Sequence, residues 1–584
     1  MQRSRKLLEL TPQEYADRAA SVFMQMLSLV PEDRQDALMA LMLDERRLSE
    51  PEAVREELLA LLSDLDIEAN REQIVSLLLE LIPVQELVPK AYEKYIQMVA
   101  DAAKVILSKL SAKRLLSKVV DQMLLPLEAT LQERLLKLIT RMPTMQKLGQ
   151  IIARNKHLDP ELRSRLQKLE NSIRDASYES ILARINDELK HKLSVYKVKL
   201  GRKFLAEASV CAVVPFTWRS PNDGVKRKGV FKVLKPFITD YWNEDLKILD
   251  ALAEHFDRNK KRYGLPTVGF RQILREVREL FKREVKLPIE QNRLQEAREF
   301  YSQETNIRVP NLLPMTTKVV TGMEFIDGLK VTVAAERFPE KRNRIAQLIL
   351  DKTILSVLFH TGEEALFHAD PHAGNIFYCE KTDELALLDW GLSCKLSRPY
   401  RRQLIQLILG FVIRDYSRAI EATCSLTDGR IAPHQIAIVE RRVKETIDKL
   451  PLFPLVRLAP LTQLLDDLIL DGLRFPAELL MFRKSLFTLL GVIHDVSAEF
   501  DVDWHVTNAL LSQMLKEMPL RLTRSPWSTD YPTQISTFEL KDVFSALVAI
   551  AAQLGMQQGK MFAALGIDRA LGKVLSVLRP ATAD

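Results

Sequence analysis

Apolar residues recur every three or four positions from Thr11 to about residue 195, which is the spacing of helices that bury one face. Two sequences there, TPQE from Thr11 to Glu14 and SEPE from Ser49 to Glu52, place a glutamate three residues after a hydroxyl residue, as a capping box requires. The pattern therefore predicts a helical N-terminal region in which helices begin at these two places.

The pattern changes between residues 193 and 326, where β-branched and aromatic residues dominate. Residues 199–218 and 229–238 flank the sequence SPNDG (220–224), so we expect a strand, a turn and a second strand. A charged helical segment follows, and then two short strand candidates, RVPNLL and TKVVTGMEFI. From Pro339 onward the helical spacing dominates again.

The chain of 584 residues is 47% hydrophobic and 28% charged, which is enough to bury more than one core. Its 84 basic residues exceed its 77 acidic residues only slightly, so the net charge of +7 does not predict a nucleic-acid partner. The four cysteines lack CxxC spacing, which favours a reducing compartment over a disulfide framework.

Two segments bear on targeting and membranes. The basic first residues acquire Glu9 and Glu14 early and lack a long apolar stretch, so we expect neither a secretory signal nor a transit peptide. Residues 543–559 are uncharged but contain Ser, Gln and Gly, and they fall short of the roughly 20 apolar residues of a membrane span. We expect a packed or surface-lying helix there.

Several candidate catalytic and metal-binding residues stand close together in the sequence FHADPHAGNIF, at residues 367–377. His368-Ala-Asp370 is followed by four residues and then Asn375, which matches the H-x-D-x-x-x-x-N pattern of kinase catalytic loops. An apolar run then ends in Asp389-Trp-Gly, where the metal-binding Asp of Asp-Phe-Gly would come. In such sites one carboxylate faces the attacking group, while an amide oxygen and a second carboxylate hold Mg²⁺ on the phosphates. We expect a strand, a loop and a strand to bring the last two ligands together.

A zinc site is the alternative for the same sequence. His368, Asp370 and His372 stand at alternate positions and would share one face of an extended strand, but no further histidine or cysteine group stands nearby in the sequence.

Upstream, Lys232 lies in a strand-like run after the predicted turn, where a kinase lysine reaches the α and β phosphates. This order of residues favours the kinase interpretation.

Longer matching sequences extend these motifs. They are KLGQ at 147–150, AEASVCAVV at 206–214, FKVLKP at 231–236, MEFIDG at 323–328, HADPHAGN, LLDWG, and the segment from Phe475 to Asp501. Over roughly residues 140–501 the chain therefore resembles the ABC1/UbiB/ADCK family of atypical protein-kinase-like proteins (AarF/UbiB-like). KLGQ, followed by the helix candidate DPELRSRLQKLENSI, is the most family-specific part.

The resemblance implies an α+β, bilobal protein-kinase-like fold with a small β-containing N-lobe and a helical C-lobe. An alanine-rich loop replaces the glycine-rich nucleotide loop, and the KLGQ extension packs over the active site. We also expect residues 474–490 to form a core helix, with Arg483 beside buried carboxylates. The expected segments are an N-terminal helical region at 1–139, the KLGQ-containing extension at 140–195, the N-lobe at 196–328, the C-lobe at 329–515 and a C-terminal helical tail at 516–584.

The resemblance also implies a role for each candidate residue. Asp370 orients the attacking group, and His368 shapes its loop. Asn375 and Asp389 bind Mg²⁺, and Lys232 contacts the α and β phosphates of ATP. The other candidate cofactor-binding residues are Lys147, Gln150, Ala206, Ala208, Ser209, Glu284, Glu290 and Glu324.

For activity, the resemblance implies an atypical kinase or ATPase that uses Mg-ATP and supports isoprenoid quinone (ubiquinone-type) or lipid metabolism. The implied partners are ATP, an isoprenoid lipid or quinone precursor, and a peripheral membrane contact, with no nucleic acid. The implied location is cytoplasmic or peripheral to a membrane, as in bacterial members, and an organelle stays open. The residues do not name the phosphoryl acceptor.

The chain departs from the family pattern at several positions. Glu284-Val-Lys286 has lysine in place of the family's aspartate. Pro288 removes a helix hydrogen bond close to Glu290, the residue that we favour as the partner of Lys232. Further departures are Glu207, a negative charge in the alanine-rich loop, Val214 in place of a histidine and Ala373 in place of a proline.

Two other function classes stay open. An aminoglycoside or choline phosphotransferase-like small-molecule kinase shares the H-x-D-x-x-x-x-N and Asp-Trp-Gly motifs, but KLGQ and the alanine-rich loop disfavour it. A nucleotide-binding pseudokinase scaffold would use its helical N-terminus, including the apolar run at 74–88, as a surface for partners or membrane. A helical-bundle core is the simpler interpretation of that run, and retention of Asp370, Asn375 and Asp389 favours turnover.

Overall fold

The computed structural model of the protein describes residues 11–44, 46–63, 65–88, 90–145, 148, 176–265, 268–429, 431–451 and 455–553. The chain divides into two compact units. Unit 1 comprises Met1–Pro288 and Leu313–Met323, and unit 2 comprises Ile289–Leu312 and Glu324–Asp584.

Unit 1 begins with short helices, most of which bury apolar residues. Their order is α1 (Pro12–Leu27), α2 (Glu32–Met42), α3 (Arg46–Ser49), α4 (Pro51–Leu61), α5 (Arg71–Leu81), η1 (Val84–Leu87), η2 (Lys90–Tyr95), α6 (Ile96–Lys109), α7 (Ala112–Met123) and α8 (Leu131–Ile139). The capping box predicted at Thr11 and Glu14 is confirmed, since each side chain accepts a hydrogen bond from the other's backbone N–H. The box predicted at Ser49 is wrong: α4 begins at a proline, and Glu50 is its N-cap, with no side-chain cap bond.

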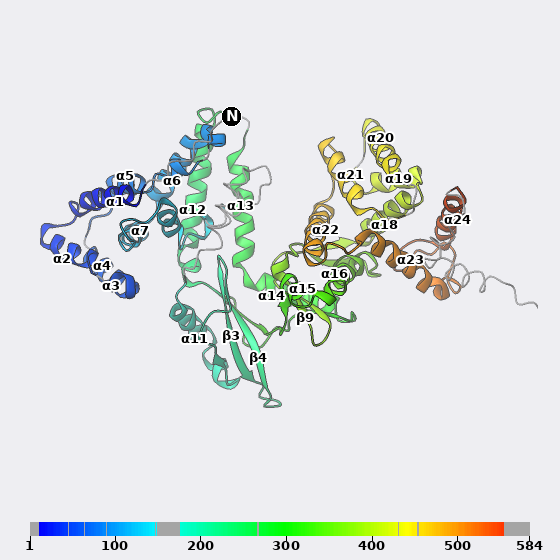
Figure 1. Ribbon diagram of the computed structural model, residues 1–584, viewed down its shortest axis with the longest axis horizontal. Helices are drawn as coiled ribbons and strands as arrows, with labels where there is room; N and C mark the ends of the chain where they lie inside the picture. The colour runs from blue at the N-terminus through cyan, green and yellow to red at the C-terminus, as the bar shows by residue number, and fades with distance from the viewer. Residues whose placement is uncertain are drawn as a thin grey trace, which may run out of the picture. The chain divides into compact units, whose positions relative to one another are not determined.

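These helices share a core with two long helices of the same unit, α12 (Pro236–Asn259) and α13 (Phe270–Val285), which stand side by side in Figure 1. The apolar run at 74–88 contributes Ile74 and Leu78 to this core, so the bundle-core interpretation of the run is confirmed. A buried ion pair crosses the same core, with Arg114 Nη1 of α7 lying 2.6 Å from Asp245 Oδ1 of α12.

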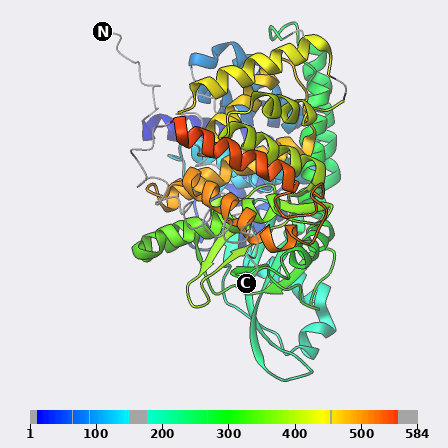
Figure 2. The same ribbon diagram turned by 90° about the vertical axis from the view of Figure 1, so that its right-hand side faces the viewer.

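A twisted sheet completes unit 1. Its strands are β1 (Lys199–Leu200), β2 (Ala206–Glu207), β3 (Cys211–Arg219), β4 (Lys226–Leu234) and β6 (Val320–Glu324), in the order β1-β3-β4-β6 with β2 also on β3. The predicted strand, turn and strand are confirmed as the long β3–β4 hairpin, visible in Figure 1 and in the turned view of Figure 2. Ile181, Ile185 and Leu189 of α11 (Tyr178–Val195) pack on one face of the sheet.

A helix is interrupted close to Pro288, the residue that is expected to disturb it. Helix α13 ends at Val285, and α14 (Leu287–Phe300) begins two residues later with the proline in its first turn. Glu290 therefore lies in the first turn of α14 and is separated from Glu284, which lies on the preceding helix. The expected disturbance of the helix is thus found as a break between α13 and α14.

Unit 2 combines small sheets with many helices. It contains β5 (Ile307–Arg308), β7 (Leu329–Lys330), α15 (Val331–Arg337), η3 (Pro339–Lys341), α16 (Arg342–Leu350), η4 (Asp351–Leu355), α17 (Ser356–Leu358), β8 (Glu364–His368), η5 (Ala373–Asn375), β9 (Ile376–Cys379), β10 (Glu384–Leu387), β11 (Ser393–Ser397), α18 (Arg398–Val412), α19 (Tyr416–Ser425), α20 (Pro433–Lys449), α21 (Leu458–Leu470), α22 (Ala477–Val496), α23 (Val502–Arg521) and α24 (Thr537–Gln553). One sheet has the order β5-β10-β9-β7, and β8 pairs with β11 in another.

Helix α22 is the core helix predicted at 474–490, and it buries Leu479, Phe482, Ser485 and Leu489. Arg483 pairs with a carboxylate as predicted, but the prediction that this carboxylate is buried is wrong. Its guanidinium pairs with Asp466, whose side chain is 37% exposed and therefore not buried.

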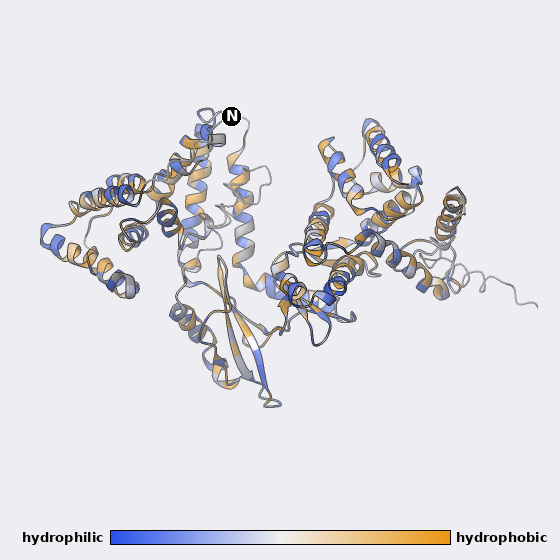
Figure 3. Ribbon diagram, viewed as in Figure 1, coloured by the Kyte–Doolittle hydropathy of each residue, from blue (hydrophilic) through white to orange (hydrophobic). Residues whose placement is uncertain are grey.

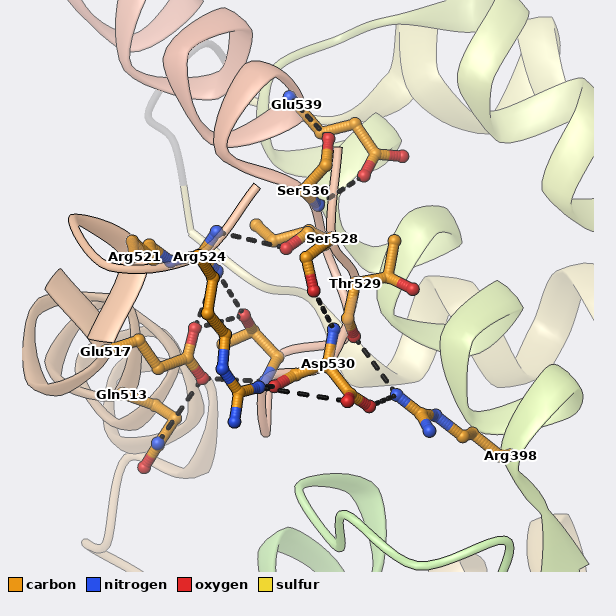
Figure 4. A network of polar contacts seen from close by, with 12 residues as sticks. Arg398, Gln513, Glu517, Arg521, Arg524, Ser528, Thr529, Asp530, Ser536 and Glu539 are labelled. Atoms are coloured by element: carbon orange, nitrogen blue, oxygen red, sulfur yellow. Dashed lines mark hydrogen bonds and ion pairs between the residues drawn. The ribbon is translucent and has the colours of Figure 1, made fainter. Parts of the chain in front are cut away.

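Polar contacts fasten the C-terminal part of unit 2 (Figure 4). Arg521 and Glu517 form an ion pair on α23 at 2.6 Å, with side chains 1% and 2% exposed, and Glu517 also accepts from the backbone N–H of Thr533 at 2.8 Å. Arg398 lies 2.6 Å from Asp530. These bonds hold the connection between α23 and α24 against the rest of the unit.

The uncharged segment predicted as a packed or surface-lying helix begins inside α24, where Val543, Leu547 and Ile550 are buried; residues 554–559 lie outside the described part. Within the described residues, no helix is both long enough and apolar enough to cross a membrane. Figure 3 shows hydrophilic and hydrophobic stretches alternating along helices such as α12 and α13.

Candidate active site

The β9–β10 hairpin of unit 2 brings Asn375 and Asp389 together. Asn375 directly precedes β9, and Asp389 follows β10 by two residues. Ile376 and Leu387 are cross-strand partners, and the Leu388 N–H donates to the Asn375 carbonyl at 2.8 Å. Both side chains therefore start from the same end of the hairpin, as the sequence predicts.

His368 holds the loop that carries Asp370. Its ring is 4% exposed, Nε2 lies 2.9 Å from the Leu388 carbonyl oxygen, and Nδ1 lies 3.2 Å from the backbone N of Asp370. Because a carbonyl can only accept and a backbone N–H can only donate, the ring is neutral with its proton on Nε2. Burial lowers the pKa of His368, which favours the same neutral form. The ring thus links the loop to the end of β10.

The amide of Asn375 is oriented by the same loop. Its Nδ2 donates to the Asp370 carbonyl at 3.2 Å. Because the two atoms of an amide group point in different directions, this bond turns Oδ1 away from that carbonyl. Oδ1 is the atom that a magnesium ion would use.

Asp389 stands at a strained backbone position beside a second carboxylate. Its φ is +52°, a left-handed value that is uncommon for residues other than glycine, and its Oδ1 accepts from the Gly391 N–H at 3.3 Å. A Cβ added to Gly391 would lie 3.2 Å from Asp389 Oδ1 and 4.0 Å from Glu290 Oε2. Arg293, one turn after Glu290 on α14, donates to the Gly391 carbonyl. The first turns of α14 thus border the Asp-Trp-Gly sequence.

Helix α22 supplies two contacts that sequence reasoning missed. Lys484 Nζ lies 3.4 Å from Asp370 Oδ1, and the Ser485 hydroxyl donates to the His368 carbonyl at 2.8 Å. The available signal was the sequence Arg483-Lys484-Ser485, which interrupts the apolar sequence LLMF…LFTLL on a helix predicted to be buried.

In unit 1, Lys232 shares a row of the sheet with the alanine-rich loop. Val213 pairs with Lys232 on one side and with Ala206 on the other. Residues paired across neighbouring strands project from the same face, so the half-buried Lys232 and the exposed Ala206 share one face, two strands apart. The loop turns back after Ala206, where the Ala208 N–H donates to the Cys211 carbonyl at 2.8 Å, and the half-buried Ser209 lies within this turn.

Glu207 projects from the opposite face. It pairs with Ala212, which belongs to the apolar cluster that packs against α11. Its carboxylate lies 2.8 Å from Lys235 Nζ, with side chains 7% and 0% exposed, and accepts from the Ala176 N–H at 3.2 Å. The extra negative charge of the loop is thus paired inside unit 1, on the face opposite Lys232.

Among the remaining candidates, Glu324 has other polar partners, and the rest lie outside the described residues. The Glu324 carboxylate bonds to Arg308 and to both the backbone N–H and the side-chain amide of Asn311, so it fastens the end of β6 to residues 308–311. Lys147, Gln150 and the side chain of Glu284 lie outside the described part of the chain.

The donor set fits magnesium and not zinc. Across the described residues, no group of three or more His, Cys, Asp or Glu side chains is placed to hold a metal ion. His372 Nδ1 accepts from the Gly374 N–H at 3.1 Å and caps the short η5 turn, so the described structure does not group His372 with His368 and Asp370 as zinc ligands. One amide oxygen and one carboxylate are hard ligands that leave positions for water and phosphate, which is the arrangement that Mg²⁺ prefers.

Comparison with known proteins assigns the domain. Residues 168–423 match the model of the ABC1 atypical kinase-like domain. The chain is 25% identical over 372 residues to the uncharacterized protein sll1770 of Synechocystis, covering 62% of this chain and 60% of that protein. It is 23% identical over 405 residues to a probable protein kinase UbiB of Xanthomonas oryzae, and 27% identical over 390 residues to one of Glaesserella parasuis. These matches cover 65% and 64% of this chain and 70% and 69% of the relatives.

Among solved structures, the Rv3197–erythromycin complex from Mycobacterium tuberculosis matches 60% of this chain and 87% of its own chain, at 16% identity and a TM-score of 0.40. The α+β, bilobal kinase-like fold class predicted from the sequence is confirmed by the domain match together with the sheet-bearing and largely helical units. Residues 168–423 therefore carry an ABC1 atypical kinase-like domain, and over about two thirds of its length the chain is similar to probable protein kinases named UbiB.

Proposed function

We propose that the protein binds Mg-ATP at the open end of the β9–β10 hairpin and transfers or hydrolyses the terminal phosphoryl group. The observation that carries this proposal is the convergence of Asn375, Asp389 and Asp370 at that end, with the loop of Asp370 held by the neutral His368 ring. Phosphoryl transfer requires positioning and charge stabilisation more than covalent chemistry by the protein. These residues supply both.

Each residue has a separate task in this proposal. Asn375 Oδ1 and the Asp389 carboxylate hold Mg²⁺, which when bound offsets the charge of the phosphates. The Asp370 carboxylate orients the hydroxyl or water that attacks and accepts its proton. His368 keeps the Asp370 backbone in place and stays neutral.

Residues of unit 1 are proposed as further phosphate contacts. Lys232 and Ala206 project from the same face of the sheet, and Glu207 leaves that face to pair with Lys235. This arrangement keeps the loop's one carboxylate away from the face that carries Lys232. The contacts proposed for Lys147 and Gln150 stay predictions.

We propose an isoprenoid quinone precursor or another lipid as the acceptor, because several relatives carry the name UbiB and the sequence resembles that family. The test is incubation of the protein with γ-labelled ATP and each candidate in detergent, followed by extraction of the organic phase. Label in an extracted lipid supports transfer, whereas label only in inorganic phosphate supports hydrolysis.

Two variants separate binding from chemistry. Asp389→Asn removes the charge of a metal ligand, so we expect loss of Mg-dependent ATP binding. Asp370→Asn removes the group that takes the proton, so we expect retained binding and phosphate release slowed by roughly 100-fold or more. Asp327→Asn makes the same chemical change at a side chain that is 71% exposed and should alter neither quantity. Binding without turnover in the wild type would favour the scaffold alternative.

A further inference from the structure

Lys484 approaches the candidate catalytic carboxylate from an element far away in the sequence. Its Nζ lies 3.4 Å from Asp370 Oδ1 and 3.5 Å from the Ala369 carbonyl oxygen, although 114 residues separate Lys484 from Asp370. The side chains of Lys484 and Asp370 are 46% and 28% exposed. The ammonium group therefore stands beside the carboxylate and in reach of solvent.

The base of this lysine is held firmly. The neighbouring Ser485 is 3% exposed, and its hydroxyl donates to the His368 carbonyl at 2.8 Å. Phe482, two residues before Lys484, packs edge-on against Phe367, with 5.3 Å between ring centroids. Helix α22 is thus seated against the residues that lead into the catalytic loop, and the direction of Lys484 is set by the fold.

The ion pair itself is too loose to serve mainly as a brace. Charge-assisted N–H···O bonds are usually about 2.7–2.9 Å long, and the distances of 3.4 and 3.5 Å here are longer. Exposed pairs of this kind contribute little to stability. An ammonium group has three donors, so Lys484 can keep one near Asp370 and direct others at a ligand.

The charges at this end of the hairpin explain why a cation is needed. Asp370 and Asp389 place two carboxylates at the proposed phosphate position, and each repels a phosphoryl group. Mg²⁺ held by Asn375 and Asp389 offsets the charge on one side. A cation on the side of Asp370 offsets it where the attacking group arrives.

We infer that Lys484 is a catalytic residue that binds the terminal phosphoryl group of ATP beside Asp370. This inference rests on the proposed function. In the transfer step the bond between the terminal phosphorus and its bridging oxygen breaks, and ADP leaves with that electron pair. A bond forms from the acceptor oxygen to phosphorus, and the acceptor proton passes to Asp370. Lys484 contacts the non-bridging oxygens throughout and exchanges no proton.

The test compares ligands that differ only in this group. We would measure the dissociation constants of Mg-ADP and of the Mg complex of the β,γ-methylene analogue of ATP by calorimetry on the full chain. For Lys484→Met we expect roughly 10–100-fold weaker binding of the analogue, the usual effect of removing a hydrogen bond to a charged group, with Mg-ADP binding unchanged. Lys484→Arg keeps the charge and should recover most of the analogue affinity.

The control is Lys341→Met, which removes a lysine paired with Glu380 at 2.9 Å elsewhere in unit 2 and should change neither constant. Equal losses for ADP and for the analogue in Lys484→Met would mean that the lysine only supports the loop, and no loss would mean that it does not touch the phosphate. Either result overturns the inference. Failure of the proposed function is distinguishable, because the wild type would then bind neither nucleotide in a Mg-dependent way.

Discussion

Replacing Glu207 with alanine tests whether the charge of the alanine-rich loop belongs to the fold or to the nucleotide site. Its carboxylate lies 2.8 Å from the fully buried Lys235 ammonium. Removing one partner of a buried ion pair lowers the free energy of unfolding by about 3–5 kcal/mol, because the other charge stays buried. Lys235 also lies 5.9 Å from the Phe237 ring, so we expect the lower end, about 3 kcal/mol. The urea unfolding midpoint should fall by about 1 M.

The same variant should bind Mg-ATP as the wild type does, because Glu207 and Lys232 project from opposite faces of the sheet. The double variant Glu207→Ala/Lys235→Met should recover much of the lost stability, since neither charge is then buried. Asp327→Ala, which breaks an exposed pair with Lys381, is the control and should change the midpoint little. A Glu207→Ala protein with wild-type stability and tighter Mg-ATP binding would refute the reasoning, because it would place this carboxylate beside the phosphates.

Two further predictions concern the candidate catalytic loop and the proposed metal ligand Asp389. Burial holds the pKa of His368 below its ordinary value of 6.5. The neutral ring therefore makes its full contribution to the free energy of unfolding above about pH 6.5, and this contribution is lost as the pH falls below that value. The thermal unfolding midpoint of the wild type should therefore fall more steeply between about pH 7 and pH 5 than that of His368→Asn; equal slopes would contradict the neutral assignment. Gly391→Ala would place a Cβ 3.2 Å from Asp389 Oδ1, so we expect Mg-ATP binding weaker by roughly 10-fold in calorimetry, with an unchanged unfolding midpoint. Wild-type affinity in Gly391→Ala would show that the position of this carboxylate does not matter.

The hairpin between Asn375 and Asp389 could be predicted because its information is local. The apolar run before Asp389 and the short sequence separation between the two candidate ligands leave few conformations other than two paired strands. The break before α14 could also be predicted from local sequence, because Pro288 disfavours a continuous helix there. The capping box at Ser49 failed for a local reason as well: Pro51 takes the first helical position, which makes Glu50 the N-cap.

The roles of Glu207 and Lys484 depend on information that the sequence does not display. The direction of Glu207 follows from the register of β2 on β3, and a shift of one residue would turn it to the other face. Lys484 reaches Asp370 only because α22 packs against β8, 114 residues away along the chain. Neither a spacing rule nor a charge pattern specifies such a contact.

The central claim is a Mg-dependent nucleotide site that requires Asp389, and the most direct measurement is the change in thermal unfolding midpoint when ATP is added with and without Mg²⁺. At one hundred times its dissociation constant a ligand stabilises the native state by about 2.7 kcal/mol, which corresponds to about 5–10 °C for a domain of moderate size. We predict a Mg-dependent shift for the wild type and for Asp327→Asn, and none for Asp389→Asn. No shift in the wild type, or the same shift in Asp389→Asn, would contradict the claim.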